Sequence, residues 1–382
     1  MSVARPNLAN SATPLDSKTL HRDAIVIDGL NTSLPSRDLF ILMQAGGLSA
    51  VHFTIAIWET FAEVAPVLVK WNTLFRENVD IVAPVQSVGD VRAAKLEGRI
   101  GIILGFQDTA PIQDQLGYVE LFSRLGIRIA QLTYMYRNLA GCGCLEEDHG
   151  LSLFGKDLIR ELNHNGIVID LSHCGHRTTM EAIEVSEDPT VFSHVGVRTL
   201  CETRRNKTDD ELKFVAEGGG VVGVVAFPTF LASNDATIAD WFRHVDYLVD
   251  LLGPDHVAIG TDFVDGQPEG FADRGFFRNL TDEDQNPPWP WIYPEGLSSV
   301  ADFPNITTGL IDRGYDKETI EKVLGGNLLR VYDRVWRRNS EARPQTGSPL
   351  AESLKYTEKG GRKTPRRGGA WNNSGQDSGG SG

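Results

Sequence analysis

Eight short apolar runs, separated by stretches of helical character, constrain the fold of this chain more than any other feature. Each run is continuously apolar rather than alternating, which is typical of parallel strands covered on both faces. A strand and a helix repeated eight times predict an α/β fold, the (β/α)₈ barrel of TIM type. The runs span residues 24–28, 50–57, 100–106, 127–133, 167–171, 190–193, 220–227 and 256–260.

The helical intervals between these runs include residues 88–97, 151–163 and 208–217. Ser87 is well placed to cap the first of them, because a side-chain oxygen can accept a hydrogen bond from a free N–H of the first turn. The paired glycines at 218–219 are expected to end the third.

Chemistry in a (β/α)₈ barrel belongs at the carboxyl ends of the strands. Here two of the apolar runs stop on a histidine, His173 and His194, and a third leads to Asp262. Two imidazoles and a carboxylate at the ends of neighbouring strands predict a divalent-metal site with a base beside it. The alternative is that each of these residues is only a polar strand terminator.

The composition excludes several classes of protein. With 382 residues and 41% hydrophobic content the chain can bury one large core. Its net charge of −14 argues against a nucleic-acid partner or an anionic membrane surface. No apolar run is long enough to span a membrane, and the N-terminus does not resemble a signal peptide. Four irregularly spaced cysteines do not form a disulfide framework, so we expect a cytoplasmic location.

Three segments are predicted along the chain. Residues 1–20 form an N-terminal extension, residues 21–340 the catalytic barrel, and residues 341–382 a tail rich in Gly, Ser and basic residues. The tail cannot bury enough apolar surface to offset its ordering entropy, so we expect it to be disordered. A localisation or docking signal is the alternative.

Several longer motifs surround the same strand ends. They are D-L-S-H at 170–173, F-S-H at 192–194, R-N at 205–206, D-D at 209–210, G-T-D-F at 260–263 and L-G-G-N-L-L-R-V at 324–331. With these motifs, about residues 20–336 resemble the renal-type, or membrane, dipeptidases of the metal-dependent amidohydrolase superfamily.

The resemblance implies a two-zinc hydrolase. One metal would take a His and an Asp from a D-G-H-N-D motif after the first strand, and a Glu after the third strand would bridge both metals. His173 and His194 would complete the second metal. Arg205 would pair with the carboxylate of the substrate, and Asp262 would move the proton.

This chain departs from that pattern at the first metal. The D-G-H-N-D motif reads D-G-L-N-T at 28–32, and Leu30 cannot ligate a metal. The bridging position is Gln107, and the position of a carbonyl-binding His is Tyr134. Two close metals need a shared anionic ligand to offset their repulsion. We therefore predict at most one zinc ion per chain.

A single catalytic zinc normally takes three protein ligands. Beside His173 and His194, the candidates are Gln107, Glu59 and Asp262, with His149 as a weaker one. Glu59 follows the second strand in apolar surroundings, and it is either a ligand or a solvated loop carboxylate.

Three functional classes remain open on the sequence alone. The first is a hydrolase of dipeptides or small carboxylate-bearing amides, in which zinc activates water and Asp262 is the base. The second is a tautomerase, lyase or decarboxylase in which Tyr134 acts as acid. The third is an inactive homologue. We expect a small-molecule or dipeptide substrate, no nucleic acid and no membrane span, while a homodimer stays open.

Overall fold

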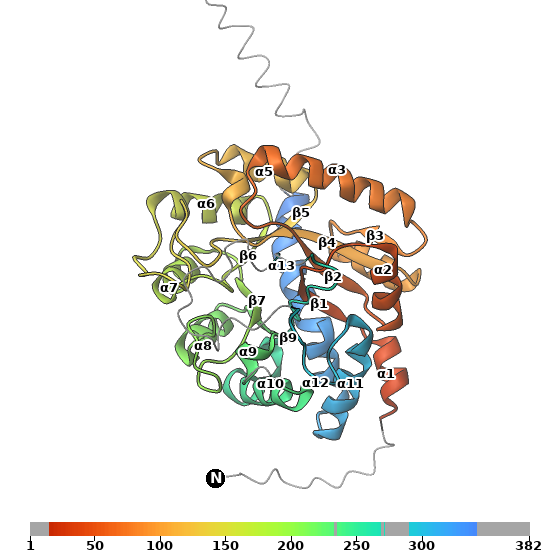
Figure 1. Ribbon diagram of the computed structural model, residues 1–382. Helices are drawn as coiled ribbons and strands as arrows, with labels where there is room; N and C mark the ends of the chain where they lie inside the picture. Colours follow the sequence, from red (N-terminus) through yellow and green to blue (C-terminus); the bar gives the residue numbers. More distant parts are fainter. Residues whose placement is uncertain (1–14, 233–234, 269–270, 272–289, 342–382) are drawn as a thin grey trace, which may run out of the picture. The chain divides into compact units, whose positions relative to one another are not determined.

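The protein folds around one parallel sheet. The computed structural model describes residues 15–232, 235–268, 271 and 290–341. Along the sheet the strand order is β1-β2-β4-β5-β6-β7-β8-β9, with β3 paired only to β4. The strands are β1 (Ile27–Asn31), β2 (Ala50–Ala56), β3 (Val82–Pro84), β4 (Ile100–Phe106), β5 (Ile127–Gln131), β6 (Val168–Asp170), β7 (Val191–Val195), β8 (Val221–Val224) and β9 (Val257–Ile259) (Figure 1).

The two ends of the sheet meet just past β1 and β9. A parallel bridge joins Asn31 to Phe263. The backbone N–H of Asp262 donates to the Leu30 carbonyl at 3.0 Å, and that of Thr32 donates to the Phe263 carbonyl at 2.8 Å. Eight strands therefore form a nearly closed barrel, and the predicted (β/α)₈ fold is confirmed.

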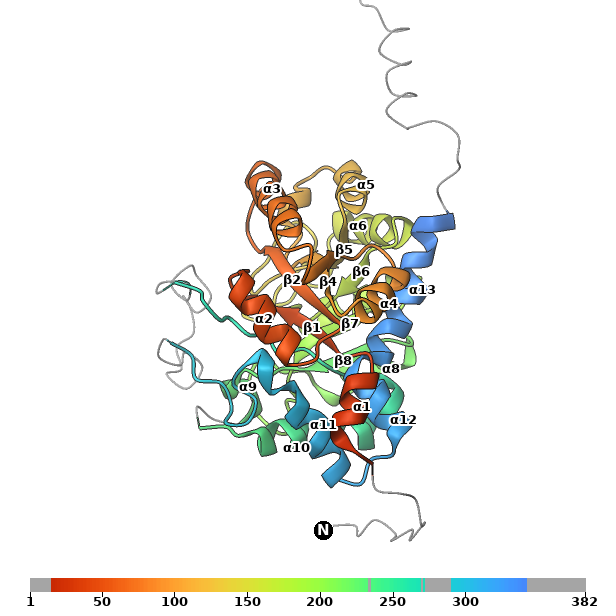
Figure 2. The same ribbon diagram turned by 90° about the vertical axis from the view of Figure 1, so that its right-hand side faces the viewer.

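Helices surround the barrel (Figures 1 and 2). They are α1 (Ser17–Asp23), α2 (Arg37–Ala45), α3 (Phe61–Glu77), α4 (Val88–Leu96), α5 (Gly117–Arg124), α6 (Leu153–His164), α7 (His176–Val185), α8 (Asp209–Glu217), α9 (Pro228–Leu231), α10 (Ile238–Leu252), α11 (Phe303–Asp312), α12 (Lys317–Glu321) and α13 (Asn327–Glu341). The three helices expected from the sequence correspond to α4, α6 and α8. Ser87 caps α4 as predicted, since its side chain accepts from the Asp90 N–H.

Only the predicted run at 100–106 matches its strand, β4, and the other seven differ in their bounds by one to three residues. β1 begins at Ile27 rather than at 24, and it includes Gly29 and Leu30, which we had placed beyond it. Gly29 fits there because a Cβ would lie 2.8 Å from the Ile259 carbonyl oxygen and 3.0 Å from that of Ser193. His194 lies inside β7 and not past its end.

The sequence also missed β3, a three-residue strand (Val82–Pro84). It pairs with the first half of β4, through Val82 with Ile100 and Pro84 with Ile102. β5 pairs with β4 only from Leu104 onward. A three-residue strand is too short to show a periodic sequence pattern. It can pair because β5 leaves the first residues of β4 without a neighbour on that side.

Helix α13 closes the amino-terminal end of the barrel. Its side chains Leu328, Tyr332 and Trp336 join a buried cluster with the first residues of the strands, such as Ile27 and Val168. Figure 2 shows α13 running beside the sheet. This end of the barrel is therefore filled by apolar side chains.

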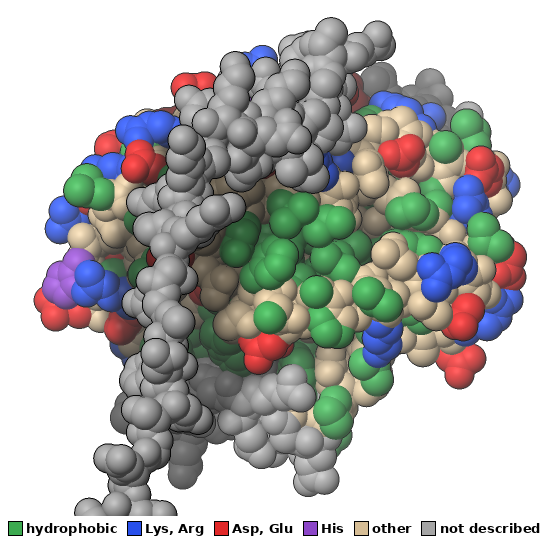
Figure 3. All heavy atoms as spheres, turned by 90° about the horizontal axis from the view of Figure 1, so that it is seen from above, with side chains coloured by type: hydrophobic (Ala, Val, Ile, Leu, Met, Phe, Trp, Pro, Cys, Tyr) green, Lys and Arg blue, Asp and Glu red, His purple; other side chains and the backbone are tan. Residues whose placement is uncertain are grey.

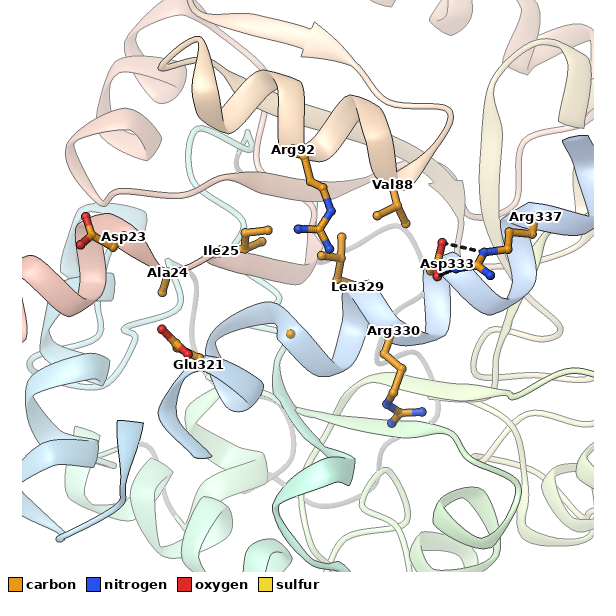
Figure 4. Close-up of a pocket in the computed structure, with 11 residues that line it drawn as sticks. Asp23, Ala24, Ile25, Val88, Arg92, Glu321, Leu329, Arg330, Asp333 and Arg337 are labelled. Carbon is orange, nitrogen blue, oxygen red and sulfur yellow. Dashed lines mark hydrogen bonds and ion pairs between the residues drawn. The ribbon is translucent and has the colours of Figure 1, made fainter. Parts of the chain in front are cut away.

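A groove of about 760 Å³ lies outside this end, between α13, α4 and the segment before β1. Figure 4 shows Arg92 of α4 facing Leu329 of α13, with Asp333 paired to Arg337. Its lining also includes Ile25, two residues before β1. The groove thus lies at the end of the barrel opposite to the predicted metal site.

The helices that cover the barrel are amphipathic. α3 buries Val64 and Trp71, whereas the charged side chains of Glu63 and Lys70 on the same helix are exposed. Figure 3 shows apolar side chains gathering on the face that carries α3 and α5, between groups of charged residues. Among the described residues, no helix combines the length and apolarity that crossing a membrane requires.

The described residues include only part of the predicted N-terminal extension and tail. Helix α1 starts at Ser17 and already buries Leu20 and His21, so ordered packing begins a few residues before the predicted start at 21. The predicted tail at 341–382 lies outside the described residues, apart from its first position.

Candidate active site

Two imidazoles meet at the carboxyl end of the barrel. His173 lies three residues past β6, and His194 lies in the neighbouring β7. Their Nε2 atoms are 2.9 Å apart, and both side chains are buried. The structure therefore brings together the two histidines that the sequence singled out.

Asp170, at the end of β6, fixes this arrangement. Its Oδ1 accepts the N–H groups of Ser172 and Ser193, both at 3.0 Å, and the Ser172 hydroxyl at 2.6 Å. Its Oδ2 accepts the Ser193 hydroxyl. One buried carboxylate thus ties the residues before both histidines together. The sequence analysis did not single out Asp170, although the D-L-S-H string contained it.

Both imidazoles are held in the neutral form. Burial lowers the pKa of His173 and of His194 well below the ordinary value, and the charge of Arg205 lowers both further. Nδ1 of His194 contacts the Ser193 hydroxyl at 2.7 Å, whereas Nδ1 of His173 is buried without a partner. Neutral imidazole is the form that ligates metals.

Arg205 binds backbone carbonyls of the two segments that carry His173 and His194. Its Nη1 donates to the Ser172 carbonyl at 2.7 Å, and its Nη2 donates to the His194 carbonyl at 2.8 Å. Its Nε is buried without a partner. Arg205 therefore keeps three further N–H groups, the Nε–H and one on each Nη, as donors for the substrate carboxylate that the resemblance implied.

Asp262 faces the same pocket from the loop after β9. It adopts a left-handed backbone conformation, with φ of 57°, which is uncommon outside glycine. Burial raises the pKa of its carboxyl to about 7, although the Arg205 charge opposes this. The Tyr293 hydroxyl donates to its backbone carbonyl at 2.6 Å. These features give a carboxyl group that exchanges a proton near neutral pH.

Gln107 and Tyr134 also line this pocket. The Gln107 Nε2 donates to the Thr54 hydroxyl at 2.9 Å, and its Oε1 is buried without a partner. The Tyr134 ring stacks on His173 with 4.1 Å between centroids. Burial raises the pKa of Tyr134 well above its ordinary value, so its phenol stays protonated.

The wall opposite Tyr134 is aromatic. It is formed by Phe227 and Phe230 after β8 together with Phe271 and Trp291. Phe227 packs against Trp291 with 4.8 Å between centroids. The sequence analysis assigned no chemistry to the end of β8, and only the position of Phe227 at a strand end could have indicated it. About 20 Å³ of the pocket is open, roughly room for one water, so a substrate must displace side chains.

Glu59 and His149 lie away from this pocket. The Glu59 carboxylate accepts the N–H groups of Ile57 at 2.6 Å and of Trp58 at 3.1 Å, so it stabilises its own turn. His149 is exposed, with its Nε2 3.9 Å from the Glu147 carboxylate. Neither residue lines the pocket that His173 and Asp262 share.

The first-metal positions also lack ligands in the structure. Leu30 is fully buried, and the Thr32 hydroxyl donates to the Phe263 carbonyl at 3.0 Å. Asp28 is committed too, because its carboxylate accepts the N–H and the hydroxyl of Thr261 at 2.8 and 2.7 Å. Asp28 thus connects β1 to the segment that carries Asp262.

The uncharged donor atoms that these residues could offer an ion are imidazole nitrogens and an amide oxygen. Two nitrogens on one tetrahedral zinc are roughly 3.3 Å apart, close to the 2.9 Å between the two Nε2 atoms. The Gln107 Oε1 is an uncommitted oxygen in the same pocket. Across the described ranges, no group of three or more His, Cys, Asp and Glu side chains is placed to hold an ion.

Comparison with known proteins identifies the kind of protein this chain resembles. The model of the family described as membrane dipeptidase, peptidase family M19, matches residues 18–286 and 291–345. A dipeptidase of Aspergillus oryzae, aclJ, is 31% identical over 264 residues, which cover 67% of this chain. The chain spans 57% of the length of that relative.

Two solved structures extend the comparison. An amidohydrolase from Pseudomonas aeruginosa is 41% identical, with a TM-score of 0.79 over 85% of this chain and 100% of that one. A metallopeptidase from Rhodobacter sphaeroides, solved with a phosphinate mimic of L-Ala-D-Ala, is 21% identical. Its TM-score is 0.69 over 82% of this chain and 100% of that one, which shows the shared fold.

Proposed function

Because the chain belongs to the membrane dipeptidase family, peptidase family M19, we propose that it is a metal-dependent hydrolase of dipeptides or other small amides. The observation that carries this proposal is the meeting of His173 and His194, with 2.9 Å between their Nε2 atoms, where His173 lines the same pocket as Asp262. Two neutral imidazoles beside a titratable carboxyl are the components of a metal-assisted hydrolytic site.

In this proposal His173 and His194 hold one zinc ion, with the Gln107 Oε1 as the oxygen ligand. A bound divalent ion supplies polarisation of the scissile carbonyl and a more acidic water. The Glu59 candidate is set aside, because its carboxylate is already hydrogen-bonded to two backbone N–H groups.

Asp262 accepts the proton of the attacking water and returns it to the leaving amine. Burial raises the pKa of this carboxyl to about 7 in the metal-free protein, so it binds a proton more readily than an exposed Asp does. Tyr134 keeps its proton because its pKa is raised, so we assign it a hydrogen-bonding role rather than that of an acid. Its ring also fixes the plane of His173 by stacking on it.

The substrate is a small molecule with an apolar group. The aromatic wall of Phe227, Phe230 and Trp291 offers dispersion contacts to such a group. Our prediction that the substrate carboxylate pairs with Arg205 rests on the Nε–H and the second N–H of each Nη, because each Nη uses one N–H for a backbone carbonyl.

A panel of dipeptides tests this function. The full chain should release amino acids from dipeptides with an apolar residue when zinc is present, and lose this activity on chelation. Loss of the second imidazole in His194→Ala should abolish it as well. Absence of turnover on the whole panel, with the wild-type protein folded and loaded with zinc, would reject the hydrolase proposal.

A second candidate is proton transfer next to a substrate carbonyl. One observation favours it: the described part of the site has no anionic bridging ligand, since that position is Gln107. Proton transfer needs only a base and one electrophile. Solvent deuterium entering an otherwise unconsumed carbonyl compound, in a protein that hydrolyses no dipeptide, would select this candidate.

A further inference from the structure

A buried ion pair between Lys207 and Glu211 contacts the segment that carries His173. Lys207, in the loop between β7 and α8, has its Nζ 3.1 Å from the Glu211 carboxylate in the first turn of α8. The two side chains are only 3% and 2% exposed. Neither residue lines the pocket that His173 and Asp262 share.

The ammonium group of Lys207 has three partners, one for each N–H. It donates to the Cys174 carbonyl at 2.7 Å, to the Thr179 hydroxyl at 3.1 Å and to Glu211. It also lies 4.9 Å from the centroid of the Phe192 ring in β7. A single side chain thus links the end of β6, helix α7, helix α8 and β7.

One of these partners is the carbonyl that directly follows His173. Arg205, two residues before Lys207, donates to the Ser172 carbonyl on the other side of His173. The carbonyl of His173 itself accepts the N–H of Cys144 at 2.8 Å. Because a carbonyl before and a carbonyl after His173 are each bound by a buried cation, the backbone position of this histidine is defined from both sides.

Glu211 orients Lys207. Its Oε2 accepts the N–H and the hydroxyl of Thr208 at 3.0 and 2.9 Å, in a capping box at the start of α8. This fixes the carboxylate, and its Oε1 is left to face the ammonium group. Burying two charges gains little stability over an apolar pair of similar volume. What the pair supplies is the Lys207 ammonium group, held so that it donates to the Cys174 carbonyl.

We propose that Lys207, oriented by Glu211, is a positioning residue that holds the Cys174 carbonyl and so places His173 opposite His194. With only two imidazoles available to an ion, a shift of either one removes half of the nitrogen ligands. Loss of a group that supports a metal ligand typically weakens metal affinity by about 10- to 100-fold. The part of this inference that concerns metal rests on the proposed function.

The test variant is the double substitution Lys207→Met with Glu211→Gln. Removing both charges avoids an uncompensated buried carboxylate, which would itself destabilise the fold. The glutamine retains an oxygen for the capping box at Thr208. A matched control is Arg128→Met, since Arg128 is a buried cation that donates to the carbonyls of Gln86, Ser123 and Ile127, near the start of β5.

Two measurements on the full chain separate the outcomes. The first is amide hydrogen exchange of the metal-free protein at Cys174, Gly175 and Cys144, whose N–H groups donate to the carbonyls of Leu171, Cys142 and His173. The second is the Kd for zinc alone, from competition with a chromophoric chelator.

The double variant should exchange faster at these three amides and bind zinc about 10- to 100-fold more weakly. Arg128→Met should lower the melting temperature and change neither measurement. Unchanged exchange at these amides in the folded double variant would overturn the inference, and so would a Kd within twofold of wild type. If the wild-type protein binds no zinc, the metal-dependent function fails, while the exchange measurement still decides the positioning role.

Discussion

At the residue scale, Asp262 stands out because its backbone and its side chain are both unusual. It has a positive φ, and its buried carboxyl lines the same pocket as the His173 imidazole. Its backbone N–H binds the Leu30 carbonyl, and its backbone carbonyl accepts the Tyr293 hydroxyl. The backbone is thus fixed on both sides, so a conservative change of the side chain leaves the local structure in place.

Asp262→Asn should preserve the fold and most of the metal binding. It should lower turnover about 100-fold or more, because the amide cannot accept a proton. The measurement is kcat on the best dipeptide together with metal content and circular dichroism. Near-normal turnover in a variant of normal metal content would contradict the assigned role.

The same residue should give the metal-free protein a pH-dependent stability. Its pKa is 3.8 in the ordinary state and about 7 in the folded one, so between these values the folded state binds the proton more tightly. Stability from this group is therefore present at low pH and lost as the pH rises through 7. Urea unfolding of Asp262→Asn should lose this slope, whereas the exposed control Asp114→Asn should keep it.

A third residue-scale prediction concerns metal content. The wild-type chain should bind close to one zinc ion, because Leu30, Thr32 and Gln107 replace the ligands of the first metal. His173→Ala and His194→Ala should each remove it, since a single imidazole leaves too few ligands. Elemental analysis after dialysis checks this, and two tightly held ions per wild-type chain would refute the one-ion site.

At the element scale, the barrel depends on α13 as a closing helix. Leu328 is 1% exposed and packs with the first residues of the strands. Asp170, the last residue of β6, lies at the other end of its strand. Helix α13 thus packs at the amino-terminal end of the barrel, while the candidate site residues come from the strand ends and loops at the carboxyl-terminal end.

Leu328→Ala should destabilise the protein by about 2–5 kcal/mol, because it leaves a cavity where α13 meets the strands. Zinc affinity of the folded variant should stay unchanged. Leu96→Ala is the matched control, since Leu96 in α4 is 87% exposed and its loss should cost little. Equal melting temperatures for the two variants would show that α13 does not close the barrel in the way described.

At the scale of the whole molecule, the barrel and the predicted tail at 341–382 differ in composition. The tail carries Gly, Ser and basic residues without an apolar period, while the chain as a whole has a net charge of −14. Its structure lies outside the described residues, so its independence from the barrel stays a prediction from composition.

Deleting the residues after 345 should leave the melting temperature and activity unchanged within error, because the segment has few apolar side chains and no apolar period. Differential scanning calorimetry and the dipeptide assay on both forms check this. A decrease of several degrees on deletion would show that the tail contributes to the folded barrel.

The sequence by itself determined the barrel fold and the strand ends that carry the candidate site residues. Continuous apolar runs are local signals, so eight strands and the positions of His173, His194 and Asp262 near their ends could be predicted. Substitutions such as Leu30 and Gln107 could also be read from single positions. Errors of secondary structure were the missed strand β3 and the bounds of the strands, such as those of β1 and β8.

Only the tertiary structure decided which groups are free to act. Glu59 and Arg205 have the right chemistry for a ligand and a carboxylate partner, yet Oε2 of Glu59 and one N–H on each Nη of Arg205 are bonded to nearby or distant backbone groups. Lys207 had no motif to mark it, and its partners come from three other elements. Such pairings depend on contacts between residues far apart in the chain, and a local pattern carries no information about which distant groups will meet.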